Sequence, residues 1–289
     1  DTFTYKANDG TVDSSSTATV TITVLPDFSS SVDAEIATAS GFDDIEPSLK
    51  LWLDASNIDG QYNATISDGQ DITIWHDFSG LSSHATDVGD MPVSVRLNEY
   101  GNNKAVIDIN GGYLDTYLPG YTGQDLTIYI VYDLKENYEG SWDSLLHTKH
   151  ATNSHSFWLM DNYNNSSTQS GFITSGSRWN YFDSGEIGEL NIFAVRINQF
   201  GGEIFMNGVS VIQDESFPFD VDRGFTIQES SITRIGQDYP TATSHTSDAH
   251  VAEIIIVYDY VYRLSPDHNR EELFLFCLLF FFLLIQYLV

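Results

Sequence analysis

Two short aromatic stretches of the sequence carry the residue types that bind carbohydrate. The first is Trp142-Asp143 and the second is Trp179-Asn180-Tyr181, and both lie in polar stretches rich in glycine and serine. An aromatic ring stacks on the C–H face of a sugar, while carboxylate, amide and backbone groups bind its hydroxyl groups. We predict that these five residues bind a ligand. The alternative is that Trp142 and Trp179 anchor their own loops.

Acidic residues at the ends of apolar segments predict a second kind of site. Asp54 and Asp77 each stand where a predicted strand meets a loop, and Asp248 lies in a predicted loop. Calcium binds the oxygen atoms of carboxylates and carbonyls, so we predict a Ca²⁺ ion with these three ligands. The alternative is that the carboxylates cap turns. An EF-hand loop is rejected, because Ala55 fills its first ligand position and Ile66 its bidentate one.

Other catalytic or metal-binding patterns are missing from the sequence. His147, His150 and His155 fall close together, and His245 and His250 flank the last loop. Zinc, however, needs three or four converging ligands, and no His-Glu-x-x-His motif occurs. We interpret these histidines as polar surface residues. The chain also contains no Gly-x-Ser-x-Gly elbow, no phosphate-binding loop and no dinucleotide-binding glycine motif.

The amino-acid composition excludes some classes of protein function. Acidic residues outnumber basic ones 41 to 12, which gives a formal charge of −29. Such a surface repels phosphate backbones, so nucleic-acid binding is not expected. The hydrophobic content of 42% suffices for a folded core. The only cysteine is Cys277, so a disulfide framework is excluded.

Short apolar segments predict the fold class. More than ten of them lie between residues 48 and 264, separated by clusters of Gly, Asn, Asp and Ser. With no long helical pattern, they predict an all-β protein, a two-sheet antiparallel jelly-roll sandwich. Asn207-Gly208 supplies the two positive φ angles of a type I′ hairpin. Ser265-Pro266-Asp267 predicts the start of a short C-terminal helix.

The chain divides into four predicted regions. Two alternating runs around an Asp-Gly turn make residues 1–25 a two-strand stub of a preceding module, and residues 26–47 read as a linker. Residues 48–272 form the main domain. The tail, residues 273–289, is almost wholly apolar, and we retain a frame error, a membrane segment and a buried helix as its interpretations. Because the chain opens inside a strand pattern, we expect a longer exported protein.

Three phrases in fixed order resemble a known family. Leu49–Ser56, Ile74–Gly80 and Val251–Asp259 are similar to strands of the laminin-G-like, concanavalin A-like lectin and glucanase superfamily found in bacterial surface proteins. The resemblance covers residues 48–272 and implies the jelly-roll sandwich. Residues 1–25 resemble the end of a cadherin-like or Ig-like repeat.

The resemblance implies a function of recognition at the cell surface. Glucanases of this superfamily carry a Glu-x-Asp-x-x-Glu strand, whereas Glu186 and Glu189 lack the intervening Asp. We therefore expect a non-catalytic module of an extracellular bacterial adhesin that binds a glycan or a surface protein. The alternatives are a structural spacer and a carbohydrate-binding appendage of a polysaccharide-degrading enzyme. Membrane contact is expected only if the 273–289 tail is genuine.

Overall fold

A computed structural model gives the fold of two compact units, Asp1–Asp43 and Asp44–Val289. The structure describes residues 2–5, 18–21, 48–100, 104–123, 125–135, 143–149, 155–161, 169–174, 180–183, 185, 187–198, 201–214, 225–227, 231–238 and 246–258. The predicted linker 26–47, the predicted helix at Ser265 and the tail 273–289 lie outside these ranges. The domain boundaries therefore stay predictions.

The first unit contains a two-stranded antiparallel sheet. Strand β1 (Thr2–Tyr5) pairs with β2 (Ala18–Thr21), and Thr2 lies opposite Thr21. The predicted pairing of the two alternating runs is confirmed. Its assignment to a cadherin-like or Ig-like repeat stays a prediction.

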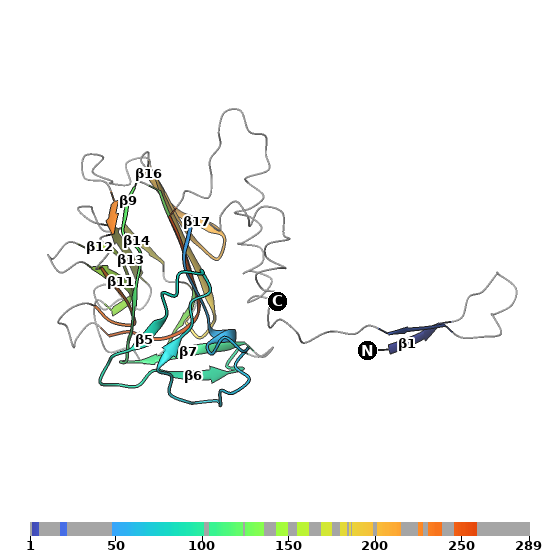
Figure 1. Cartoon of the computed structure of the whole chain (residues 1–289). Coiled ribbons are helices and arrows are strands. Elements are labelled where there is room, and N and C mark those ends of the chain that lie inside the picture. The colour runs from blue at the N-terminus through green and yellow to red at the C-terminus, as the bar shows by residue number, and fades with distance from the viewer. Residues whose placement is uncertain are drawn as a thin grey trace, which may run out of the picture. The chain divides into compact units, whose positions relative to one another are not determined.

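The second unit is built from two eight-stranded sheets, and every strand pair is antiparallel (Figure 1). In spatial order, the first sheet contains β17 (Val209–Asp214), β16 (Gly201–Met206), β15 (Asn191–Asn198), β10 (Leu126–Leu134), β20 (Asp248–Val257), β7 (Ala105–Asn110) and β6 (Ser94–Leu97), with β3 (Leu49–Asp54) also paired to β20. The second contains β14 (Asn180–Asp183), β13 (Gln169–Thr174), β12 (His155–Asp161), β11 (Asp143–Lys149), β19 (Ile232–Ile235), β8 (Leu114–Tyr117), β5 (Ala85–Asp87) and β4 (Ile74–Trp75).

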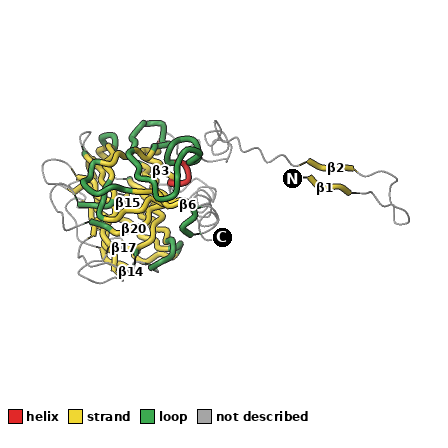
Figure 2. Tube along the Cα trace, turned by 90° about the horizontal axis from the view of Figure 1, so that it is seen from below, coloured by secondary structure: helices red, strands yellow, loops and turns green. Residues whose placement is uncertain are grey.

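Short elements complete the second unit. Strand β9 (Tyr121–Gly123) pairs with β18 (Phe225–Ile227), and the 3-10 helix η2 (Ala55–Asn57) follows β3 (Figure 2). The part of the chain that the structure describes holds no α-helix. No helix within it has the length and apolarity that a membrane crossing needs. The predicted all-β antiparallel sandwich is confirmed.

The core lies between the two sheets and follows the two-residue alternation of the strands. In β3 the odd positions Leu51 and Leu53 are buried, and they join one apolar cluster with Ile130 and Ile254 of the first sheet and Phe157 of the second. Burying one such side chain stabilises the fold by about 1.5–3 kcal/mol. The alternation therefore decides which residues point into the core and which point outward.

Strand β20 holds the first sheet together. One edge pairs with β10 along most of its length, with a bulge between Val131 and Tyr132. The other edge pairs first with β7, through residues 248–251, and then with β3, through residues 253–257. Strands β7 and β3 therefore lie end to end along β20. This arrangement brings residues from distant parts of the sequence onto one outward face.

Candidate functional site

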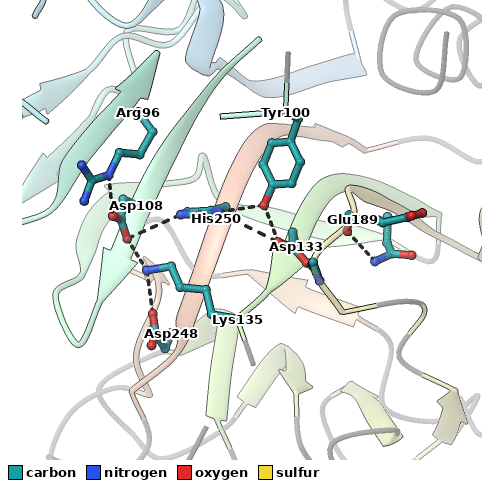
Figure 3. A network of polar contacts seen from close by, with 10 residues as sticks. Arg96, Tyr100, Asp108, Asp133, Lys135, Glu189, Asp248 and His250 are labelled. Atoms are coloured by element: carbon teal, nitrogen blue, oxygen red, sulfur yellow. Dashed lines mark hydrogen bonds and ion pairs between the residues drawn. The ribbon is translucent and has the colours of Figure 1, made fainter. Parts of the chain in front are cut away.

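Charged side chains of neighbouring strands gather on the outward face of the first sheet. In β20, Ala249 and Val251 lie in the core, so Asp248 and His250 point outward. The same alternation in β10 turns Asp133 outward. Together they form a group that we call the β20 network (Figure 3), which consists of Arg96, Tyr100, Asp108, Asp133, Lys135, Asp248 and His250.

One half of the β20 network centres on the buried carboxylate of Asp108. Arg96 Nε donates to Asp108 Oδ2 at 2.9 Å, and Lys135 Nζ donates to Asp108 Oδ1. Lys135 also lies 2.7 Å from Asp248 Oδ1. Burial alone would raise the pKa of Asp108, but the hydrogen bonds from Lys135 and Arg96 outweigh it and hold the pKa below its ordinary value. Asp108 is therefore a stably ionised anchor for two cations.

The other half of the β20 network centres on the hydroxyl group of Tyr100. This hydroxyl donates to Asp133 Oδ2 and lies 2.7 Å from His250 Nδ1. The backbone N–H of Gly188 donates to Asp133 Oδ1 at 2.7 Å. Since a phenol has one proton and gives it to Asp133, His250 Nδ1–H must donate to the phenol oxygen. His250 Nε2 then faces Asp108 Oδ1 at 3.8 Å and joins the two halves.

Burial shifts the proton affinities of this half. It raises the pKa of Asp133, and the hydrogen bond from Tyr100 only partly opposes that shift. Burial and the nearby Lys135 ammonium group lower the pKa of His250. The imidazole is therefore neutral at neutral pH. Three carboxylates and two cations then leave the β20 network with one formal negative charge.

The outer rim of the β20 network is partly exposed. The Arg96 side chain is 42% exposed, and the side chains of Lys135 and Asp248 are partly exposed. These three groups offer both donors and acceptors, while Asp108 and His250 beneath them are buried and fix their positions. Such a surface can bind hydroxyl groups, and its net negative charge disfavours phosphate.

The predicted sugar-binding residues fall in the second sheet. Asp143 opens β11, while Asn180 and Tyr181 open β14, and strands β12 and β13 lie between them. Three strand spacings separate the backbones by about 14 Å. Trp142 and Trp179 lie outside the described residues. The proposed ligand role of these five residues stays a prediction.

The carboxylate of Asp77 accepts four hydrogen bonds from the protein. The donors are the backbone N–H groups of Trp52, Ser79 and Ser83 at 2.9 Å each, and the Ser79 hydroxyl at 2.7 Å. They tie β3 to the loop after β4. Asp77 is thus used as a turn-forming and strand-bridging carboxylate.

The three predicted calcium ligands do not meet at one point. Asp54 caps η2 by accepting from the backbone N–H and hydroxyl of Ser56, both at 2.7 Å. It lies opposite Glu253 on β20, five residues and about 17 Å from Asp248. Asp248 belongs to the β20 network. Within the described ranges, no three His, Cys, Asp or Glu residues are grouped to hold a metal ion, and calcium binding stays a prediction.

The interpretation of His147 and His250 as surface residues is wrong, because both are buried. The side chain of His147 is fully buried, its Nδ1 atom lies 2.6 Å from Asp238 Oδ1, and its ring stacks on Trp158 at a centroid distance of 4.9 Å. The side chains of His150, His155 and His245 lie outside the described ones.

Sequence reasoning missed most of the β20 network. A signal was present, because Asp108 interrupts the apolar strand 105–109, Asp133 follows the apolar run 126–132, and His250 stands just before another such run. Ionisable residues inside apolar strands are rare unless they are paired. The pairing partners could not be identified without knowing the order of the strands.

The fold defines the second unit as an antiparallel β-sandwich with a polar network on one outward face. No protein-family model matches the chain, and no curated protein sequence matches it. The chain is similar to the solved Trypanosoma rangeli sialidase in complex with 2,3-difluorosialic acid, with 13% identity, a TM-score of 0.48, and coverage of 74% of this chain and 31% of that one. It is also similar to the botulinum neurotoxin serotype D binding domain, with 14% identity, a TM-score of 0.49, and coverage of 76% and 50%.

Proposed function

We propose that the second unit is a non-catalytic recognition module whose β20 network binds a neutral glycan. The observation that carries the proposal is the mixed rim of Arg96, Lys135 and Asp248 held by buried ionic partners. Elsewhere on the same face, β10 and β20 carry apolar residues such as Tyr129 and Ile255.

Neutral glycans suit this rim better than anions do. Hydroxyl groups accept from guanidinium and ammonium groups and donate to carboxylates, and the rim offers all three. A phosphate would meet the net negative charge of the β20 network, to which the partly exposed carboxylate of Asp248 contributes at the rim. We place the module in an exported bacterial protein, with Ca²⁺ as a proposed structural ion.

A glycan array and polysaccharide pull-down test the proposal with three variants. Arg96→Met plus Lys135→Met should abolish binding to the glycan that the wild type retains. Arg196→Met is the matched control, because Arg196 also lies on the first sheet and pairs with a carboxylate, that of Glu203. Trp142→Ala plus Trp179→Ala tests the aromatic stretches as the alternative site.

Each outcome of this experiment has one meaning. Loss only in the Arg96 and Lys135 variant supports the β20 network. Loss only in the tryptophan variant moves the site to the second sheet and contradicts the network. If the wild type binds no glycan, the module is a spacer, and hydrolysis of a polysaccharide would overturn the non-catalytic assignment.

A further inference from the structure

Exposed apolar side chains gather at the other sheet. Of the eight large hydrophobic residues that are exposed among the described ones, five lie in or beside β4, β5 and β8 and are 44–58% exposed. We call them the acidic apolar patch, which consists of Ile74, Leu81, Val88, Met91 and Tyr117. Monomeric proteins rarely expose grouped apolar side chains without a binding role.

The strand register places three of these side chains, those of Ile74, Val88 and Tyr117, on one outward face. Ile74 lies opposite Thr86, and Thr86 lies opposite Asp115, so the three form one row across β4, β5 and β8. Val88 and Tyr117 each stand two residues from this row, on opposite sides of it because β5 and β8 are antiparallel, and they share its face, since alternate residues of a strand do so. The row and Tyr117 together span about 12 Å.

Exposed carboxylates stand beside the patch. The sequence contains no Lys or Arg from residue 51 to residue 95, whereas Asp71, three residues before Ile74, and Asp90, next to Met91, are exposed. The strand register places the cation Arg234 opposite Asp115, which binds it through two hydrogen bonds of 2.7 and 2.9 Å. The rim is therefore negative.

We propose that the acidic apolar patch is a docking surface for a cationic protein segment that presents aliphatic side chains. Four of the five side chains are aliphatic and pack against aliphatic partners, whereas a sugar would find only the single ring of Tyr117 to stack on. A second copy of the chain would bring its own carboxylates against these, so a basic partner is the complementary one. The patch lies on the second sheet and is independent of the β20 network.

Binding of a synthetic peptide that alternates leucine and lysine tests the docking surface. Val88→Ser plus Met91→Ser should weaken this binding about tenfold, because both side chains would be buried in the complex. The matched control is Val209→Ser plus Val211→Ser, two exposed valines on β17 of the first sheet. All these side chains are exposed, and equal melting temperatures of the variants would show that folding is unchanged.

Charge is tested in parallel. Asp90→Asn should weaken binding of the leucine and lysine peptide more than Asp183→Asn, since both carboxylates are exposed and only Asp90 lies beside the patch. A peptide of serine and lysine should bind more weakly than the leucine and lysine peptide. Equal weakening by the two valine-containing pairs, equal binding of the two peptides, or displacement of the peptide by a neutral glycan would overturn the proposal.

Discussion

At the scale of single residues, Asp77 and Asp59 accept equal numbers of hydrogen bonds but differ in burial, so comparing them shows how burial affects the stability that those bonds provide. Asp59 accepts from Gln61 N, Asn63 N, Thr65 N and Thr65 Oγ1, so both carboxylates have four donors. Only Asp77 is buried. A buried donor that loses its acceptor destabilises the fold, because water cannot reach the donor to replace the lost hydrogen bond.

We predict that Asp77→Ala lowers the free energy of unfolding by about 3 kcal/mol and Asp59→Ala by about 1 kcal/mol. Urea unfolding of the two variants and the wild type measures both values. Equal losses would mean that the hydrogen bonds of Asp77 are no more protected from water than those of Asp59.

His250 predicts a dependence of stability on pH. In the folded protein, burial and the charge of Lys135 lower the pKa of His250, and they outweigh Asp108, Glu99 and Asp133, which raise it. The unfolded chain therefore binds the proton at a higher pH than the folded chain. The free energy of unfolding should decrease as pH falls from about 6.5 towards the lowered pKa.

His250→Gln should remove this part of the pH dependence, because glutamine does not titrate. Urea unfolding in steps between neutral and mildly acidic pH compares the variant with the wild type. If both lose stability equally over that range, His250 is not the responsible group.

At the scale of elements, glycine positions show how closely the strands approach one another. Gly236 follows β19 with φ of +94°, and a Cβ atom there would lie 2.7 Å from Ile109 Cγ2 and 2.9 Å from the carbonyl oxygen of Gly112. Gly80 has φ of +82°, but its Cβ would meet nothing within 4 Å. A substituted residue would have a strained, positive φ angle at both positions, but only Gly80 has room for an added Cβ atom.

Gly80→Ala should cost about 1 kcal/mol, from backbone strain alone. Gly236→Ala should cost about 3 kcal/mol or more, because the added methyl group also displaces β7. Thermal or urea unfolding of the two variants and the wild type measures both losses of stability. Equal costs would show that the strands at Gly236 separate without loss.

The elements also show how far the sequence could predict the structure. Strands β3 and β20 fall on the segments Leu49–Ser56 and Val251–Asp259 that resemble family strands, and the positive φ angles of 49° at Asn207 and 81° at Gly208 agree with the predicted hairpin. The β20 network was not predictable, because it needs β20 to pair with β7, which begins 143 residues earlier along the chain (248 against 105). Periodicity shows which face a residue occupies, but it does not show which strand is the neighbour.

At the scale of the whole molecule, the two sheets place two kinds of surface on opposite sides of one sandwich. The first sheet carries the β20 network and the second carries the acidic apolar patch. A rigid core of packed side chains between them holds both in place. The two binding sites that we propose therefore do not compete for one face.

Calcium is tested on the whole molecule. An ion that binds only the folded chain raises its stability by mass action, so an excess of chelator should lower the melting temperature. Adding back Ca²⁺ should restore it, and Mg²⁺ serves as the control. An unchanged melting temperature in chelator would remove calcium from the proposal.

The most direct test is the affinity of the purified module for the glycan that an array selects, measured by titration calorimetry. The β20 network predicts that Arg96→Met plus Lys135→Met weakens this affinity about a hundredfold, since two charged hydrogen-bonding groups are lost, while Arg196→Met leaves it unchanged. Equal affinities of the double variant and the wild type would contradict binding at the outward face of β20.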